Sequence, residues 1–409
     1  FNALALGKQV FTLAPTAAAR DVLRAEGFAQ AQTVAYLLKN EVLQARAREQ
    51  IIWIDEAGLL SVPDMVKIFA VAEQLDCRVI LSGDSGQHRA VNRGDALRLL
   101  EKKAGIRPVE VREIMRQSGA YKQVVDAFAV GNVERAFALL DGLGWVQEVP
   151  TDQLSERLVE DYLALRGQKE EALIVSPTHR QGNEVTEKIR AALKERGEIG
   201  KEDRKVSVLR NLHLKDAEKT DPAMYQAGQI VQFLQNVPGF PNGERVKIEG
   251  KDTDGNVMVM SRAGQKLRLP LERAEDFQVY VPERIGIAAG DTIRITHNAK
   301  TADGHTISNG TLCQVSKVSA SGAITLANGW HLGPDFAHLA QGYCVTSLSS
   351  QGKSPRNVLV AQGMQSLAAS SREQEYVSLS RGKQSARLYT DNKLELMRRV
   401  KESSHRASA

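Results

Sequence analysis

Two adjacent acids, Asp55 and Glu56, directly follow the apolar run Ile51-Ile52-Trp53-Ile54. Carboxylates at the end of a buried strand are costly to desolvate unless they meet a cation or a proton to abstract. In nucleotide hydrolases the first acid of such a pair holds Mg²⁺ and the second polarises the attacking water. A strand end with two solvated acids is the alternative, and the pair alone does not exclude it.

A second polar strand end comes one helix later, where Gly83-Asp84-Ser85-Gly86-Gln87 follows the apolar run 78–81. The Gln87 side chain could hydrogen-bond a γ-phosphate and respond to its loss. By itself the segment reads as a polar, glycine-rich turn. Together with Asp55 and Glu56, in that order, it favours a nucleotide site.

Arg116 and Arg381 are candidate arginine fingers. A planar guanidinium that stays charged suits the negative charge that develops on a transferred phosphoryl group. A surface ion pair is the alternative for either arginine. For Arg381 it is disfavoured, because the residue follows an apolar, strand-like run, 376–380, directly.

The elements that would position these residues alternate between strand and helix. Continuous apolar runs are typical of parallel strands buried on both faces, and functional groups then gather at the carboxyl ends of the strands. The pattern predicts strands at 10–13, 51–54, 78–81, 172–175, 343–346, 357–360 and 386–389, and helices at 32–49, 62–75, 181–195 and 392–401.

Between residues 206 and 338 the pattern changes to short alternating strands. Turn dipeptides separate them, the strongest local signal for hairpins: Asn242-Gly243, Asp254-Gly255, Asp303-Gly304, Asn309-Gly310 and Asn328-Gly329. We therefore predict an α/β protein of two motor-like domains with an all-β, small-barrel insertion in the second. The expected boundaries are 1–165, 166–205 and 339–401 for the α/β parts, 206–338 for the insertion and 402–409 for a tail.

The amino-acid composition excludes several classes of protein. With 409 residues, 42% hydrophobic and 25% charged, the chain is not disordered, collagen-like or a coiled coil. No stretch approaches the roughly 20 apolar residues that span a bilayer, so membrane insertion is not expected. Three scattered cysteines match neither a disulfide framework nor a zinc pattern, which favours the cytoplasm. A net charge of +5 permits a polyanionic partner without establishing one.

Five ordered motifs resemble those of superfamily 1 DNA helicases of the RecD-like branch, namely motifs Ia, II, III, V and VI. They are Leu13-Ala14-Pro15-Thr16, Ile54-Asp55-Glu56-Ala57-Gly58, Gly83-Asp84-Ser85-Gly86-Gln87, Ser350-Gln351-Gly352 and Tyr376-Val377-Ser378-Leu379-Ser380-Arg381-Gly382. The segments 328–331, 338–347 and 370–376 are similar to the helicase portion of MobF-type (TraI/TrwC-like) conjugative relaxases. That family joins a DNA-nicking relaxase to a helicase with 5′-to-3′ polarity.

The resemblance implies two RecA-like domains, ATP and Mg²⁺ as cofactors, and single-stranded DNA as partner, with conjugative transfer proteins as further partners. It assigns Asp55 to Mg²⁺, Glu56 to activating water and Gln87 to sensing the γ-phosphate. Arg116 and Arg381 become the two arginines that reach the nucleotide, and Gly352 is also expected beside it.

The same resemblance implies a single-strand track. Its candidate residues are Pro15, Thr16, Thr178, His179, Ser350 and Gln351. Such a track needs basic charge for phosphates and a few rings for stacking. His179 is the one stacking candidate, and a solvated loop histidine is the alternative.

One departure from the family pattern concerns motif I, the phosphate loop G-x-x-x-x-G-K-[ST]. The only Gly-Lys-Ser, at 352–354, has Ser347 where the first glycine should stand. Residues 1–6 resemble the end of the helix that follows this loop, so we expect truncation there and little ATP hydrolysis by these residues alone. Two other interpretations stay open: a RecD-like repair helicase, and a non-catalytic module that binds single-stranded DNA.

Overall fold

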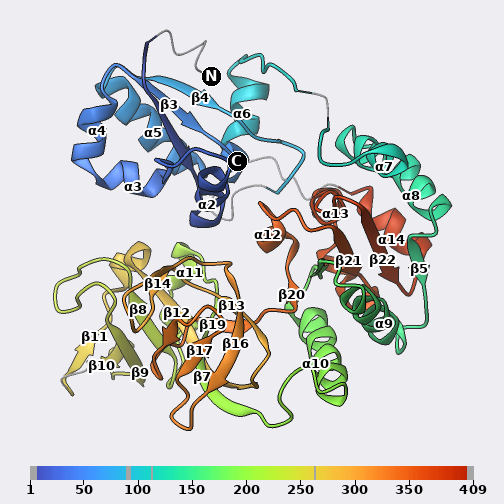
Figure 1. Ribbon diagram of the computed structural model, residues 1–409. Helices are drawn as coiled ribbons and strands as arrows, with labels where there is room; N and C mark the ends of the chain where they lie inside the picture. Colours follow the sequence, from blue (N-terminus) through green and yellow to red (C-terminus); the bar gives the residue numbers. More distant parts are fainter. Residues whose placement is uncertain (1–6, 89–93, 112–113, 262–263, 403–409) are drawn as a thin grey trace. The chain divides into compact units, whose positions relative to one another are not determined.

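A computed structural model describes residues 7–88, 94–111, 114–261 and 264–402 (Figure 1). The predicted tail, apart from its first residue, and the segment 1–6 lie outside these residues. The chain divides into two compact units. Unit 1 comprises 1–195 and 342–409, and unit 2 comprises 196–341. The α/β pattern of the sequence therefore maps to unit 1, which receives unit 2 as an insertion.

The first sheet of unit 1 is four-stranded and parallel, in the order β2-β1-β3-β4. Every residue of the strand that precedes Asp55 is buried, as its unbroken apolar sequence predicts. The strands are β1 (Val10–Ala14), β2 (Gln32–Thr33), β3 (Ile51–Ile54) and β4 (Arg78–Leu81). The helices are α2 (Ala17–Ala25), α3 (Val34–Lys39), α4 (Glu41–Ala47), α5 (Val62–Gln74) and α6 (Ala96–Lys103).

The helix predicted over 32–49 is interrupted at Asn40. This residue ends α3 and caps α4, where its Oδ1 accepts a 2.8 Å hydrogen bond from the backbone N of Leu43. Asparagine competes with helix continuation in this way because its short side chain can satisfy a free amide at a helix start. The first two predicted residues form strand β2 instead.

The second sheet is five-stranded and parallel, in the order β20-β6-β21-β22-β5. Its strands are β5 (Val146–Glu148), β6 (Ala172–Val175), β20 (Cys344–Val345), β21 (Asn357–Ala361) and β22 (Ser385–Thr390). Its helices are α7 (Gly119–Ala129), α8 (Val133–Gly142), α9 (Leu154–Gly167), α10 (His179–Glu195), α12 (Ser347–Ser350), α13 (Arg372–Leu379) and α14 (Lys393–Val400). Both sheets being parallel with covering helices, the predicted α/β class is confirmed.

The predicted domain boundary at 165 falls inside α9. Strand β5 pairs with β22, and residues of α7 and α8 share one hydrophobic core with β6, β21 and β22. Residues from 119 onward therefore belong with the second sheet. The sequence between 119 and 165 alternates helix and strand like the first domain, so its pattern could not show which sheet it joins.

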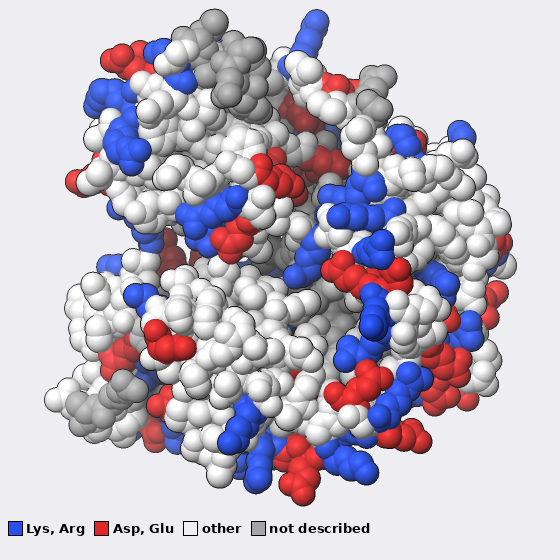
Figure 2. Space-filling view, viewed as in Figure 1, with Lys and Arg blue, Asp and Glu red and all other residues white. Residues whose placement is uncertain are grey.

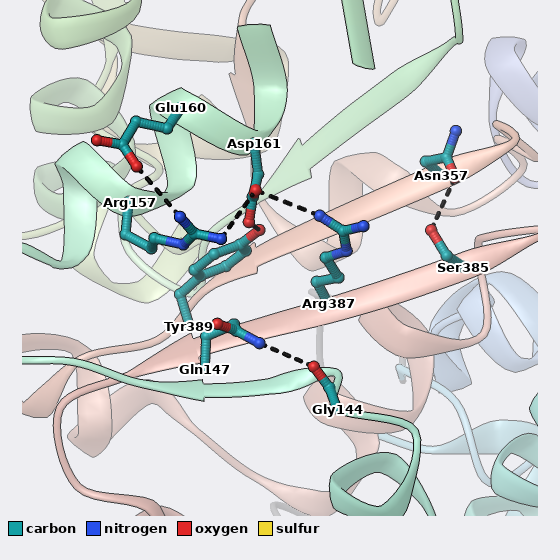
Figure 3. Close-up of polar contacts among 9 residues, drawn as sticks. All are labelled: Gly144, Gln147, Arg157, Glu160, Asp161, Asn357, Ser385, Arg387 and Tyr389. Atoms are coloured by element: carbon teal, nitrogen blue, oxygen red, sulfur yellow. Dashed lines mark hydrogen bonds and ion pairs between the residues drawn. The ribbon is translucent and has the colours of Figure 1, made fainter. Parts of the chain in front are cut away.

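A buried carboxylate ties α9 to this sheet (Figure 3). Asp161 accepts a 2.6 Å hydrogen bond from the hydroxyl of Tyr389 and forms ion pairs with Arg157 at 3.2 Å and Arg387 at 3.3 Å. Burial raises the pKa of Tyr389, and Asp161 raises it further. The hydroxyl therefore remains a donor and holds strand β22 to the helix.

Unit 2 is built mainly from antiparallel strands. One sheet has the order β11-β10-β9-β8-β12-β7, another β18-β17-β16-β13-β19, and β14 pairs with β15. The strands are β7 (Arg204–Asn211), β8 (Ile230–Phe233), β9 (Arg245–Lys251), β10 (Val257–Met260), β11 (Lys266–Arg268), β12 (Phe277–Ile287), β13 (Thr292–Ile295), β14 (Ala299–Lys300), β15 (Thr306–Ile307), β16 (Leu312–Val318), β17 (Ile324–Leu326), β18 (His331–Leu332) and β19 (Leu339–Gln341). A short helix, α11 (Asp216–Lys219), lies between β7 and β8.

The turn dipeptides that predicted these hairpins have the backbone they require. The glycines at 243, 255, 304, 310 and 329 all have φ between 82° and 87°, in the region that residues with a Cβ rarely adopt. Along the described parts of the chain, no helix has the length and apolar character needed to cross a membrane. Cys77, Cys313 and Cys344 form no disulfide with one another.

Candidate active site

The carboxyl ends of β3 and β4 lie side by side, because these strands are neighbours in a parallel sheet. The segments that follow them also touch: the backbone N of Ala57 donates to the carbonyl of Ser82 at 2.8 Å. Gly83 makes this approach possible, since a Cβ there would stand 3.1 Å from the backbone N of Ala57. The sheet therefore brings the Asp55-Glu56 pair next to the segment that carries Gln87.

Asp55 is held by a hydroxyl. Its Oδ1 accepts a 2.7 Å hydrogen bond from Oγ of Ser82, which in turn accepts one of 2.8 Å from Nε1 of Trp53. The carboxylate is thus fixed in orientation by Ser82, which directly follows β4 and is itself held by Trp53 of β3. A fixed carboxylate suits a metal ligand, because outer partners orient the groups that bind the ion.

Glu56 has an unusual backbone. Its φ of 53° and ψ of 36° place it in the left-handed region, just before the 3₁₀ turn Ala57–Leu59. A residue with a side chain rarely adopts this conformation, and such strain is concentrated at functional sites. The turn directs the chain away from the sheet directly after the acid pair.

Burial raises the pKa of Glu56, and the neighbouring carboxylates of Asp55 and Asp84 raise it further, while Arg381 and Arg116 oppose the shift. A carboxylate with a raised pKa is a better proton acceptor for water than an exposed one. The charges of both predicted arginines therefore act on Glu56.

The loop after β4 is organised around Asp84. Its Oδ1 accepts from the backbone N of Gly86 at 2.8 Å, and its Oδ2 accepts from Nε2 of Gln87 at 3.1 Å. A second glutamine contacts the side chain of Gln87: Nε2 of Gln351 donates to Oε1 of Gln87 at 3.4 Å. Gln87 is therefore held at both ends of its amide.

Arg381 lies at the end of α13, and only 2% of it is exposed. Its Nε donates to the carbonyl of Val377 and its Nη2 to Oγ of Ser380, both at 3.0 Å. Burial, and secondarily the charge of Arg116, lowers the pKa of Arg381 to about 10, so it stays protonated at neutral pH. The run before it, predicted to be strand-like, is the helix α13.

Arg116 is exposed and donates from Nη1 to the carbonyl of Ser380 at 3.0 Å. Two guanidinium groups are therefore held at the same turn, although the charge of Arg116 disfavours that of Arg381. A bound polyanion would relieve this repulsion, because it would neutralise both groups.

The turn after α13 is fixed by two residues that sequence reasoning missed. Nε2 of Gln117 donates to the carbonyls of Ser380 at 2.9 Å and Gly382 at 2.5 Å, and the hydroxyl of Tyr121 donates to the carbonyl of Leu379. The position of Gln117, directly after Arg116, was the one available signal. These contacts make the arginine positions depend on α7 and the segment before it.

A cavity of about 260 Å³ opens among these residues. Three predicted site residues line it together, from three separate segments of the chain. The lining consists of Gln87, Ile114, Met115, Arg116, Gln117, Val125, Tyr376, Ser380 and Arg381. Gly352, predicted beside the nucleotide, is not in this lining; it has a φ of 76° and lies toward Val22 of α2.

The predicted track residues have diverse environments. Oγ1 of Thr16 caps α2 by accepting from Ala19, and Oγ1 of Thr178 accepts from Gln181 at the start of α10, where His179 is the first residue. Pro15 directly precedes this Thr16 cap.

Ser350 differs from the other track candidates. It is fully buried, and its hydroxyl donates to the carbonyl of Ser347 at 2.6 Å. Its side chain is therefore not available to DNA in this structure, because the fourth residue of α12 points into the protein.

On the face that Figure 2 shows, basic and acidic side chains are interspersed, consistent with 54 basic and 49 acidic residues. An electrostatic footprint for DNA would be a basic stripe or patch. The track therefore remains a prediction from the motifs.

The residues present fit one end of a Mg²⁺–nucleotide complex. Asp55 is an oriented carboxylate, and Gln87, Arg116 and Arg381 carry N–H donors at the cavity of the kind that phosphate oxygens accept. Among the described residues there is no group of three or more metal-ligating side chains, so an ion here would keep water or phosphate ligands, as Mg²⁺ commonly does.

Comparison with known proteins places these features in context. The family model described as an AAA domain matches residues 2–151. Multifunctional conjugation protein TraI of Escherichia coli is 25% identical over 94% of this chain, and that of strain K12 is 24% identical over the same share. Conjugal transfer protein TraA of Agrobacterium fabrum is 28% identical over 46% of the chain.

Solved structures of Pif1 helicases are also similar. One from Bacteroides, in complex with ADP-AlF3 and ssDNA, is 17% identical, with a TM-score of 0.38 over 96% of this chain and 84% of that one. One from Candida albicans is 16% identical, with a TM-score of 0.40 over 97% and 86%. The chain spans 25% of the length of each TraI relative, so the match concerns one part of those proteins. The resemblance to TraI-like conjugative relaxases that the motifs predicted is thereby confirmed.

Proposed function

We propose that this chain is the ATP-dependent DNA helicase portion of a conjugative relaxase, moving 5′ to 3′ on single-stranded DNA during plasmid transfer. The observation that supports this best is the convergence of Gln87, Arg116 and Arg381 on one cavity, with Glu56 electrostatically coupled to both arginines. The similarity to TraI along 94% of the chain supports the same function.

Each residue has a chemical role in the proposal. Bound Mg²⁺ would neutralise phosphate charge and be held by Asp55, either directly or through water. Glu56 orients the attacking water and takes its proton. Gln87 contacts the γ-phosphate, and Arg116 and Arg381 stabilise the negative charge that grows on the transferred group.

DNA contacts are proposed for Pro15, Thr16, Thr178, His179 and Gln351. The hydrogen bond between Gln351 and Gln87 supports a connection from the phosphate sensor to this track. In the setting of plasmid transfer, further partners would be conjugative transfer proteins, those of the relaxosome or the coupling protein.

The 409 residues contain no G-x-x-x-x-G-K-[ST] sequence. We propose that the site needs a phosphate loop in addition to these residues, and that the 409 residues alone hydrolyse ATP poorly. Without that loop the β- and γ-phosphates lose several charge-assisted contacts of roughly 1.5–3 kcal/mol each.

The lack of a phosphate-loop sequence in the 409 residues favours a second candidate, a module that binds single-stranded DNA without catalysis. The residues assigned to ATP hydrolysis would then stabilise the fold and have no catalytic role. A RecD-like repair helicase is a third candidate, and the similarity to conjugation proteins argues against it.

The test is ATP hydrolysis by a chain extended upstream of Phe1 through a phosphate loop, with and without a dT oligonucleotide. We expect DNA-stimulated turnover, and a loss of about 10²–10⁴-fold for Glu56→Gln with nucleotide binding retained. Glu156→Gln, on the exposed side of α9, is the matched control. Equal turnover in both variants, or none in the parent chain, would refute the proposal.

A further inference from the structure

Tyr376 of α13 contacts the loop that carries Gln87, although the two segments are far apart in the sequence. Its hydroxyl donates a 2.9 Å hydrogen bond to Oδ2 of Asp84. Its ring lies against the same loop, since a Cβ on Gly86 would stand 3.7 Å from Cε1 of Tyr376. Only 8% of Tyr376 is exposed. The loop is therefore held both by a hydrogen bond and by ring packing.

Asp84 contacts both Tyr376 and the loop that carries Gln87. Its carboxylate accepts from the hydroxyl of Tyr376, from the backbone of Gly86 and from the amide of Gln87. Two carboxylate oxygens offer about four acceptor positions, so all three donors can be accommodated. The Tyr376 hydroxyl and the Gln87 amide share Oδ2, and the position of one affects the other.

We propose that Tyr376 is a positioning residue for Gln87, acting through Asp84. The inference rests on the function proposed above and deepens it. When the Gln87 amide turns toward a γ-phosphate, Asp84 loses one donor, and the Tyr376 hydroxyl keeps its carboxylate in place. Because Arg381 lies in the turn directly after α13, this helix and its turn then position both the sensor and the arginine.

Burial supports this role, because it raises the pKa of the Tyr376 hydroxyl, and Asp84 raises it further. The hydroxyl thus remains a hydrogen-bond donor throughout the neutral range. Tyr376→Phe removes the donor and keeps the ring against Gly86, so it separates the hydrogen bond from the packing.

Tyr389 offers a matched control. It is also buried, it also donates to a carboxylate, at 2.6 Å from Asp161, and it belongs to the same unit (Figure 3). It does not line the cavity. A merely structural role for Tyr376 predicts that Tyr376→Phe and Tyr389→Phe have similar effects.

The experiment compares both variants in the chain that carries its phosphate loop. We expect Tyr376→Phe to lower kcat for DNA-stimulated ATP hydrolysis by about 10–100-fold, the scale on which small misplacements reduce rates, with KM for ATP nearly unchanged. Tyr389→Phe should keep the parental kcat. Thermal unfolding of both variants measures any common structural effect.

An equilibrium readout accompanies turnover. The affinity for a fluorescent dT oligonucleotide is measured with and without a non-hydrolysable ATP analogue, and we expect Tyr376→Phe to abolish the change that the analogue causes. In an Asp84→Asn background, Tyr376→Phe should have little further effect on kcat, because the pathway is already broken.

The outcomes separate the two hypotheses. Equal kcat for both tyrosine variants, or additive effects of Tyr376→Phe and Asp84→Asn, would overturn the positioning role and leave the proposed function intact. Absence of DNA-stimulated hydrolysis in the parent chain would overturn the proposed function, and the inference with it.

Discussion

Oγ of Ser82 donates a 2.7 Å hydrogen bond to Oδ1 of Asp55, across the carboxyl ends of two adjacent strands. If Asp55 holds Mg²⁺, this hydroxyl orients the ligand. We expect Ser82→Ala to raise the Mg²⁺ concentration needed for half-maximal ATP hydrolysis by about 10–100-fold, the usual cost of losing an outer partner. Ser385→Ala, which removes a 2.7 Å bond to Asn357 in the other sheet, is the control (Figure 3). Equal Mg²⁺ dependence in the two variants would count against Asp55 as a ligand.

Arg381→Ala should reduce DNA-stimulated ATP hydrolysis by about 10³–10⁵-fold, because it withdraws positive charge from the transferred phosphoryl group. Binding of single-stranded DNA without nucleotide should change little. Arg387→Ala removes an arginine from the same unit, outside the cavity, and should retain turnover. Near-parental rates for Arg381→Ala would end its assignment as an arginine finger.

Glu375 is fully buried on α13, and within the described chain neither of its carboxylate oxygens has a hydrogen-bond partner. Burial raises its pKa to about 8, which the neighbouring Gln362 amide opposes. Between the ordinary value of 4.5 and about 8, the folded state keeps a proton that the unfolded state has lost. This group therefore lowers the free energy of unfolding as pH rises through that window, by about 1.4 kcal/mol per pH unit at most.

Glu375→Gln should remove this dependence, because glutamine is a neutral mimic of the protonated acid. We expect the variant and the parent to have similar stability near pH 4.5, and the variant to be more stable at pH 8. Urea unfolding at several pH values measures the difference. A difference that stays constant with pH, or favours the parent at pH 8, would show that Glu375 is ionised in the folded protein.

Asp161→Ala should lower the free energy of unfolding by about 2–4 kcal/mol, since it leaves the buried Tyr389 hydroxyl without its acceptor and Arg387 without its partner. Tyr389→Phe removes the hydroxyl itself, so no buried donor is left without an acceptor. It should lower the free energy of unfolding by about 1 kcal/mol. Urea unfolding of the 409-residue chain measures both. If Asp161→Ala cost no more than Tyr389→Phe, the ion pairs of Figure 3 would contribute nothing measurable.

The strands could be predicted because buried parallel strands carry unbroken apolar runs. Val10–Ala14, Ile51–Ile54 and Ala172–Val175 lie within a residue of the predicted positions. The acid pair and the Gln87 loop follow from the same logic, since each directly succeeds such a strand. The hairpin turns could be predicted equally well, because their positive φ angles favour glycine over residues with a Cβ.

Other features depend on contacts between distant segments, which periodicity does not encode. In the sequence, Tyr376 is one more residue of an apolar run, and its contact with Asp84 is evident only in the fold. The run before Arg381 is rich in residues typical of strands, yet it belongs to a helix that Ser371 caps, and Gln374 of that helix donates to Ser378 on the next turn. Strand β5, three residues long, leaves too short a pattern to reveal its sheet.

Strand β6 pairs directly with β20, with Cys344 opposite Ile174, although all of unit 2 intervenes between α10 and β20 in the sequence. The hydrogen bonds of the sheet in unit 1 are therefore complete without any strand from unit 2. A lineage could lengthen, shorten or exchange unit 2 without rewriting the core that holds the arginines. The insertion is in this sense a replaceable module, and its sequence can change apart from selection on the residues that line the cavity in unit 1.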